Sequence, residues 1–291
     1  MIKVQVLPSL ITIGNLLCGF FAICISASFL RTEQFSDPNT IDHVAYQFLN
    51  IFRKEGIKDF LHQDKQLLHI SMGLIFLGMV FDAFDGKVAR MTNHVTEFGA
   101  ELDSLADAIT FGVAPAFLAV VMLHVTNADS DKFKVIYLIP SVFMICAVLR
   151  LARYNVERND PSKDKGYFKG LPTPAGAAAI VSLIWLEVTY APFSTAIFKY
   201  VLLISCVVIG LLEVSNIKYL HLAQKILKEP KSIYFIALLM VVLYVLSNYF
   251  VTSVFVLSYG YVIICTALDI KERIKNKRLA SAFEDDTDGV V

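Results

Sequence analysis

The sequence predicts an all-α integral membrane protein with about eight transmembrane helices. Hydrophobic residues make up 56% of the 291-residue chain and charged residues only 18%, whereas a soluble domain carries about 25% charged residues. The hydrophobic residues are gathered in runs close to the ~20 residues that cross the ~30 Å hydrocarbon core of a bilayer. Four aspartates nevertheless stand beside two of these runs, and acids in that position indicate a functional site.

Hydropathy predicts the spans in chain order. The first run begins at Pro8 and has no clear small-residue cleavage site, so we expect a retained helix rather than a cleaved signal peptide. The fifth run is rich in small residues. The last two are separated by almost nothing, which predicts a tight helical hairpin. The predicted spans are 8–30, 67–89, 98–124, 134–154, 173–191, 197–214, 232–249 and 251–269.

Two segments are predicted to lie outside the membrane. Segment 31–66 is polar, but its apolar residues recur at the i, i+3, i+4 spacing of one helix face. This pattern predicts an amphipathic helix on the membrane surface or against the bundle; a partly ordered connecting loop is the alternative. The tail, 271–291, begins basic and ends acidic, and we expect the acidic end to be disordered. The apolar residues of the stripe are Ile41, Val44, Ala45, Phe48, Leu49 and Phe52.

The distribution of basic residues predicts the orientation. They are concentrated in one set of connections, and the positive-inside rule places these connections, both termini and the aspartates on the cytoplasmic side. The short N-terminus favours a prokaryotic plasma membrane. The net charge of zero gives no reason to expect a nucleic-acid partner. The basic segments are 87–90, 150–169, 218–231 and 271–278.

The aspartates are spaced to form a metal site. Asp82 and Asp85 are three residues apart, Asp103 and Asp107 are four apart, and each pair shares a helix face. A short turn between the second and third spans would make these helices antiparallel neighbours, so the pairs would face each other. Hard carboxylate oxygens suit Mg²⁺ or Mn²⁺. Nearby small residues and Arg90 would admit and bind a phosphate group, which suggests transfer chemistry on a lipid diphosphate.

This pattern resembles the complete signature of the CDP-alcohol phosphatidyltransferase family. The resemblance implies a six-helix core, usually dimeric, that binds CDP-diacylglycerol with two divalent cations. The core would be residues 1–214, with 31–66 as an insertion, 215–270 as an added two-helix hairpin and 271–291 as a charged cytoplasmic tail. The matching positions are Asp82-x-x-Asp85-Gly86-x-x-Ala89-Arg90, eight residues, then Gly99-x-x-x-Asp103-x-x-x-Asp107.

Residue roles follow from the resemblance. It implies that Asp82, Asp85 and Asp103 are metal ligands. Asp107 would be the general base and can also touch a metal. The CDP-diacylglycerol site would be lined by small residues and one arginine, namely Gly86, Ala89, Arg90 and Gly99.

Flanking stretches resemble the membrane-integral type of phosphatidylserine synthase within that family. The resemblance implies transfer of the phosphatidyl group of CDP-diacylglycerol to the hydroxyl of L-serine, with release of CMP. The stretches that carry it are Leu7–Phe20, Asp103–Asp107 with Phe111–Pro115, Arg150–Asn155 and Lys169–Gly176.

These stretches contain further candidate ligands. Arg150 and Arg153 share a helix face and are expected to receive the serine carboxylate or the donor phosphates; anchoring in lipid headgroups is the alternative. Pro172 and Thr173 begin the fifth span, where free helix amides can bind a carboxylate or simply start the helix. On the first span, Thr12 and Asn15 are predicted to bind the nucleotide, with interhelical hydrogen bonds as the alternative.

Two other functions are compatible with parts of this pattern. The same fold could use another acceptor: glycerol-3-phosphate, inositol phosphate or choline. A phosphorylated acceptor should need more cations than Arg150 and Arg153 supply. A cation transporter is the rival from a different class, but transport sites usually lie near mid-membrane on broken helices. Here the acids gather at one interface beside an arginine and glycines.

Overall fold

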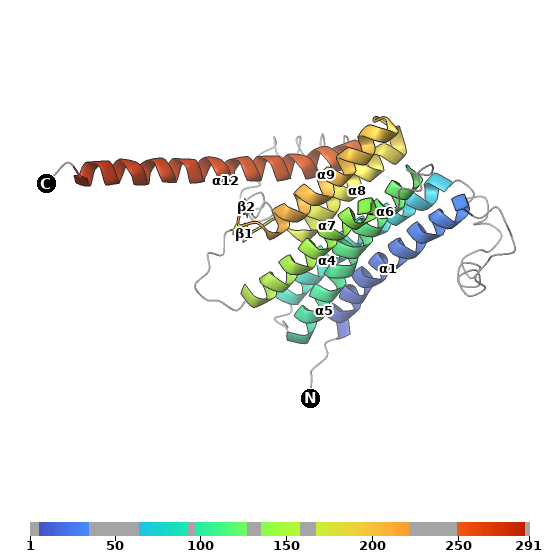
Figure 1. Ribbon diagram of the computed structural model, residues 1–291. Helices are drawn as coiled ribbons and strands as arrows, with labels where there is room; N and C mark the ends of the chain where they lie inside the picture. Colours follow the sequence, from blue (N-terminus) through green and yellow to red (C-terminus); the bar gives the residue numbers. More distant parts are fainter. Residues whose placement is uncertain are drawn as a thin grey trace, which may run out of the picture.

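The computed structural model describes six segments of the chain (Figure 1). Within them the chain is helical apart from one small sheet and short connections. Three predicted features lie outside the described residues: the span 232–249 except for its last residue, the hairpin that it would form with the next span, and the amphipathic helix in segment 31–66. The described segments are 6–34, 64–91, 97–126, 135–157, 167–220 and 249–288.

Seven spans in the described residues are long and apolar enough to cross a membrane. The chain is therefore an all-α, multi-pass membrane protein, as predicted, and seven of the predicted ranges coincide with helices. The third span is one continuous helical run with a π-helical turn, η2, in its middle. The helices are α1 (Val6–Gln34), α4 (Asp64–Met91), α5 (Glu97–Asp107), η2 (Ala108–Val113), α6 (Ala114–Val125), α7 (Val135–Glu157), α8 (Thr173–Tyr190), α9 (Thr195–Val214) and α12 (Phe250–Asp288).

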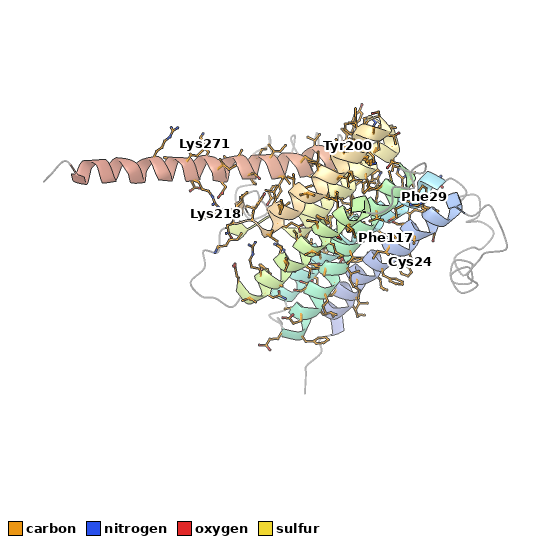
Figure 2. All side chains as sticks on the ribbon, viewed as in Figure 1. Cys24, Phe29, Phe117, Tyr200, Lys218 and Lys271 are labelled. Atoms are coloured by element: carbon orange, nitrogen blue, oxygen red, sulfur yellow. The ribbon has the colours of Figure 1, made fainter. Side chains whose placement is uncertain are left out.

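The α5–η2–α6 run is the most enclosed of the spans, with 61% of its apolar window buried, against 11% for α12. It packs against α1, α7 and α8, while α4 lies along α1. Phe29 and Phe117 lie among the packed helices, whereas Tyr200 is 61% exposed on the outside of α9 (Figure 2). Exposed apolar side chains on the outer faces suit contact with lipid tails.

The π-helical turn follows Asp107 directly. Turns of this kind are rare and frequently occur at functional sites. The turn is fixed to α1, because the Thr110 hydroxyl donates a hydrogen bond to the Asn15 carbonyl oxygen at 2.9 Å. Thr110, Phe111 and Gly112 are buried. The residue that precedes the turn, Asp107, is thereby held at a fixed place against α1.

The sequence does not predict a two-stranded antiparallel sheet that the structure contains. It pairs the connection between α7 and α8 with the segment that follows α9. Strand β1 (Tyr167–Lys169) pairs with β2 (Lys218–Leu220). The next residue, Gly170, has φ of +80° and donates its amide to the Ile217 carbonyl oxygen at 2.8 Å. Only glycine adopts this conformation readily. The entry to α8 is therefore anchored at the end of α9.

Helix α12 is longer than the predicted last span and corrects the prediction for the tail. It continues to Asp288, so the acidic end that we expected to be disordered is helical. The physical reason is that neither glycine nor proline interrupts the chain between Gly260 and Gly289. Figure 1 shows α12 extending well past the other helices, and the exposed Lys271 lies on this outer section (Figure 2).

Helix α12 is joined to β2 by polar contacts. The Tyr219 and Thr266 hydroxyls are 3.0 Å apart, and burial raises the pKa of the Tyr219 phenol, which therefore stays neutral. The Lys218 amide donates to Asp269 at 3.2 Å. Asp269 also pairs with Arg273 at 2.5 Å, and Arg273 in turn bonds a backbone carbonyl of the α9–β2 connection. These contacts fix α12 against the sheet.

Candidate metal centre

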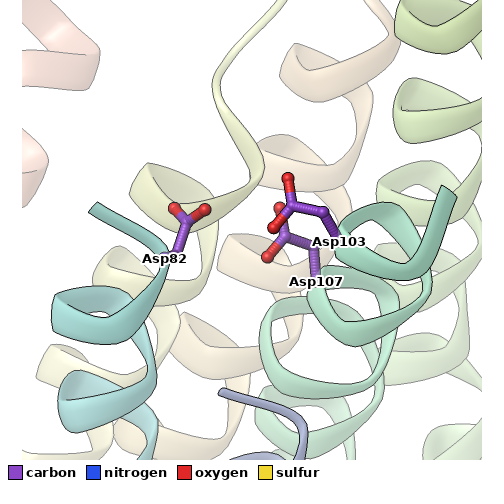
Figure 3. Close-up of side chains that lie close together, drawn as sticks. All are labelled: Asp82, Asp103 and Asp107. Carbon is purple, nitrogen blue, oxygen red and sulfur yellow. The ribbon is translucent and has the colours of Figure 1, made fainter. Parts of the chain in front are cut away.

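Three of the four predicted acids come together. Asp82 projects from α4 toward Asp103 and Asp107 on α5 (Figure 3). Carboxylate oxygens of the three residues all lie within 4.8 Å of one another. Asp107 is 9% exposed. The i, i+4 spacing puts Asp103 and Asp107 on one face of α5. The third acid comes from α4, which packs on α1 as α5 does.

Asp85 lies outside this three-aspartate cluster. It is 6% exposed and accepts a hydrogen bond from the Thr12 hydroxyl of α1. Its charge still acts on Asp82, one helical turn away. Asp85 is thus tied to α1 rather than directed at the other three acids.

Helix α1 also holds Asp107. The Asn15 amide nitrogen donates to Oδ1 of Asp107 at 3.0 Å, and Asn15 is fully buried. Thr12 and Asn15, which we predicted to bind the nucleotide, therefore have aspartates as hydrogen-bond partners. Both contacts are hydrogen bonds between helices, which was the alternative to nucleotide binding for these two residues. Sequence alone did not pair these residues, because 73 and 92 positions separate the partners.

The three-aspartate cluster fits a divalent cation. Three carboxylates at this separation repel one another, and burial strengthens the repulsion, so an intervening cation would stabilise the arrangement. Carboxylate oxygen is the ligand that Mg²⁺ and Mn²⁺ prefer. Within the described residues, Arg150 is a nearby cation whose charge acts on both Asp82 and Asp107.

Arg150 is a buried cation beside the cluster. It lies on α7, is 8% exposed and donates from Nη1 to the Thr173 hydroxyl at 3.0 Å. Its guanidinium also lies over the Tyr154 ring, 5.5 Å from the centroid, a cation–π contact. Besides the two cluster acids, its charge acts on Glu213 of α9. A buried guanidinium of this kind can bind an anion that enters the cluster.

Arg153 contacts backbone carbonyl oxygens within the fold. Its Nη1 donates to the Val214 carbonyl oxygen at 2.9 Å. Its Nη2 contacts three further carbonyl oxygens, those of Lys169, Glu213 and Ser215, at 2.9, 3.2 and 3.3 Å. These carbonyls belong to the end of α9 and to β1, so Arg153 caps a helix and joins it to the sheet.

The start of α8 is also engaged within the fold. The Pro172 carbonyl oxygen accepts the amides of Ala175 and Gly176 at 2.9 and 3.0 Å. The Thr173 hydroxyl accepts the hydrogen bond of Arg150. Pro172 therefore serves as the N-cap of the helix, and Thr173 orients the arginine.

The remaining predicted residues lie on the same two helices as the acids. Gly86, Ala89 and Arg90 are in the last turns of α4, where their side chains lie outside the described residues. Gly99 is in the first turn of α5.

Sequence reasoning missed Glu213, a buried acid close to Arg150. Glu213 lies at the end of α9, is fully buried, and neither of its carboxyl oxygens has a hydrogen-bond partner within the described residues. The signal was available, because an acid at the end of an apolar span has the same cost as the four aspartates. The surrounding signature does not include it.

The three aspartates lie within the part of the chain that matches a known protein family. The profile of the CDP-alcohol phosphatidyltransferase family matches residues 5–212, more than half of the chain. The protein is thus a multi-pass membrane protein with an acidic cluster between two helices, and the chain belongs to the CDP-alcohol phosphatidyltransferase family.

Relatives in three organisms carry the name CDP-diacylglycerol–serine O-phosphatidyltransferase. The Methanocaldococcus jannaschii protein is 40% identical over 156 residues, which cover 54% of this chain and 66% of that protein. The Mycobacterium tuberculosis protein is 37% identical over 132 residues, covering 44% and 43%. The Helicobacter pylori protein is 32% identical over 178 residues, covering 60% and 72%. The chain thus spans less than two thirds of the first two relatives.

Proposed function

We propose that the protein transfers the phosphatidyl group of CDP-diacylglycerol to the hydroxyl of L-serine and releases CMP. The observation that carries this proposal is the three-aspartate cluster of Asp82, Asp103 and Asp107, which stands within the family signature. The name shared by the three relatives supports serine as the acceptor. The chain would then be a membrane-embedded transferase of phospholipid biosynthesis.

The cluster is proposed to hold Mg²⁺ or Mn²⁺. Asp82, Asp103 and Asp107 would be ligands of one cation, and Asp85, from the same face of α4, would serve a second. Bound divalent cations would neutralise the diphosphate and stabilise the departing phosphate of CMP. Thr12 supports this arrangement by holding Asp85 from α1.

Asp107 is proposed to be the general base. Its carboxylate would accept the proton of the serine hydroxyl as the serine oxygen bonds to phosphorus. The bond from phosphorus to the CMP oxygen breaks, and CMP leaves with the electron pair. The hydrogen bond from Asn15 supports this role, because it fixes Oδ1 and so orients the rest of the carboxylate.

Substrate contacts are proposed for residues around the cluster. The small residues at the ends of α4 and α5, with Arg90, would line the CDP-diacylglycerol site; they are Gly86, Ala89 and Gly99. Arg150, held by Thr173, would bind the serine carboxylate. The carbonyl contacts of Arg153 favour a structural role, so we do not propose it as a ligand.

The wider organisation is also a proposal. We propose a catalytic core of residues 1–214 with an insertion at 31–66, an added hairpin at 215–270 and a charged tail at 271–291. The protein would act as a homodimer in the plasma membrane, with its site on the cytoplasmic side. Support for the orientation comes from the basic residues near the aspartate stretch.

An acceptor panel tests the proposed function. Purified protein is given CDP-diacylglycerol and Mn²⁺ or Mg²⁺ with serine, glycerol-3-phosphate, inositol phosphate or choline. We expect CMP release that depends on serine, with a labelled phosphatidylserine product. CMP release that follows another alcohol and not serine would contradict the acceptor and leave the family assignment intact.

A further inference from the structure

Glu213 has an unusual environment for an acid. It lies in the last turn of α9, is fully buried, and both carboxyl oxygens lack a hydrogen-bond partner in the described part of the chain. A buried carboxylate normally has a partner, since burial without one is costly. An exception of this kind calls for an explanation.

The first turn of α8 gives part of that explanation. A Cβ atom at Gly176 would collide with Oε1 of Glu213, so the acid lies directly against this turn. Helix N-termini carry a partial positive charge, which favours an anion there. Only the missing side chain at Gly176 permits so close an approach.

Arg150 gives the other part. Arg150 and Glu213 both contact the first turn of α8, at Thr173 and Gly176, and the charge of Glu213 acts on Arg150, yet the two do not form a hydrogen bond. Arg150 instead donates to Thr173. The guanidinium is therefore hydrogen-bonded to a neutral group, while the charges of Asp82, Asp107 and Glu213 act on it from three helices.

The negative charges of these acids would not act equally on Arg150 during turnover. Cations at the three-aspartate cluster would offset the charges of Asp82 and Asp107, and they would also repel the guanidinium. Glu213 is outside that cluster and would keep its charge effect on Arg150. An arginine stays protonated under these conditions, so it needs a remaining anion to stay buried.

We propose that Glu213 is a positioning residue, whose carboxylate keeps the Arg150 guanidinium inside the bundle beside Thr173 when cations occupy the three-aspartate cluster. Arg150 then presents its free donors to the carboxylate of the acceptor. This inference rests on the proposed function, because it takes the acceptor to carry a carboxylate.

Steady-state kinetics of Glu213→Gln test the proposal. The substitution keeps the shape and removes the charge. We expect the KM for serine to rise by at least about tenfold, while kcat and the KM for CDP-diacylglycerol change by less than about threefold. Glu213→Asp keeps the charge and should restore part of the serine affinity. A wild-type KM for serine in Glu213→Gln would overturn the proposal.

Glu187→Gln is the matched control. Glu187 lies at the other end of α8, where it accepts the Phe193 amide at 3.4 Å. The same change of charge there should leave the KM for serine within about twofold of the wild type. An equal rise in both variants would also overturn the proposal, since it would reflect general loosening of the bundle.

A stability cycle covers the case in which Glu213→Gln folds poorly. The thermal midpoints of Glu213→Gln, Arg150→Gln and the double variant are measured in detergent with and without Mn²⁺. We expect the double variant to lose less than the sum of the two single losses, because it removes both buried charges together. Additive losses would overturn the counter-charge role.

The cycle also separates this inference from the proposed function. If wild-type protein releases CMP without any dependence on serine, the proposed function fails. The midpoints still report whether Glu213 and Arg150 act on each other.

Discussion

At the scale of single residues, Asn15 determines how the Asp107 carboxylate lies. The hydrogen bond between them is 3.0 Å long and crosses from α1 to α5. Replacing Asn15 with Ala leaves Oδ1 of Asp107 without its donor, so the carboxylate can rotate away from its position. We expect kcat to fall about 10- to 100-fold, because small misplacements of a catalytic group have effects of this size.

Ser26→Ala is the control for this prediction. Ser26 is also a buried polar residue of α1 and contacts Ser71 of α4 at 2.6 Å. It lies three turns from Asn15, so its loss should leave kcat within about twofold. Turnover measured with saturating substrates compares the two variants. A fall in kcat of the same size in both would show that α1 acts only as a packing element.

At the scale of elements, Arg153 holds the end of α9 to β1. Its guanidinium contacts four backbone carbonyls. Arg153→Ala leaves these carbonyls without their donor, and we expect a loss of about 2–4 kcal/mol in the free energy of unfolding. Thermal denaturation in detergent measures it. The remaining folded protein should keep a near wild-type KM for serine.

An unchanged thermal midpoint together with a raised KM for serine would contradict this prediction. Arg153 would then be a ligand, as its sequence position suggests. Lys271→Ala, which removes an exposed cation from α12, is the control: it shows how far the loss of one positive charge alone changes the thermal midpoint and the KM for serine.

Some features of these elements could be predicted and others could not. The spacing of Asp103 and Asp107 predicted their shared face, because helical period is a local property. The strand pair β1–β2 has three residues a side, too few for a periodic signal. The π-helical turn after Asp107 depends on the contact of Thr110 with α1, which no local pattern encodes.

At the scale of the whole molecule, hydropathy was sufficient to predict the fold class, because each described span needs only a continuous apolar run. It could not predict which polar residues meet. Glu213 and Arg150 are far apart in sequence, and only the packing of α7 against α9 brings them together. The signature predicted the acids of the cluster, whereas the contact of Asn15 with Asp107 and the surroundings of Glu213 required the tertiary structure.

Removal of residues 276–291 tests the role of the outer part of α12. The contacts that join α12 to β2 come from residues up to Arg273. We therefore expect the shortened protein to keep its activity within about twofold in the CMP-release assay. Asp269→Ala in the full chain should be less stable than this shortened protein. Loss of activity on shortening would assign the outer section a direct part in function.

The central claim is that Asp107 accepts the serine proton at a metal-dependent cluster. The most direct measurement is serine-dependent CMP release by purified wild-type protein and Asp107→Asn, each with Mn²⁺ and with chelator, alongside binding of CDP-diacylglycerol. The account predicts metal-dependent release by the wild type. In Asp107→Asn we expect release to fall at least about 100-fold while donor binding stays measurable. Retained turnover in Asp107→Asn, or full wild-type activity in chelator, would contradict it.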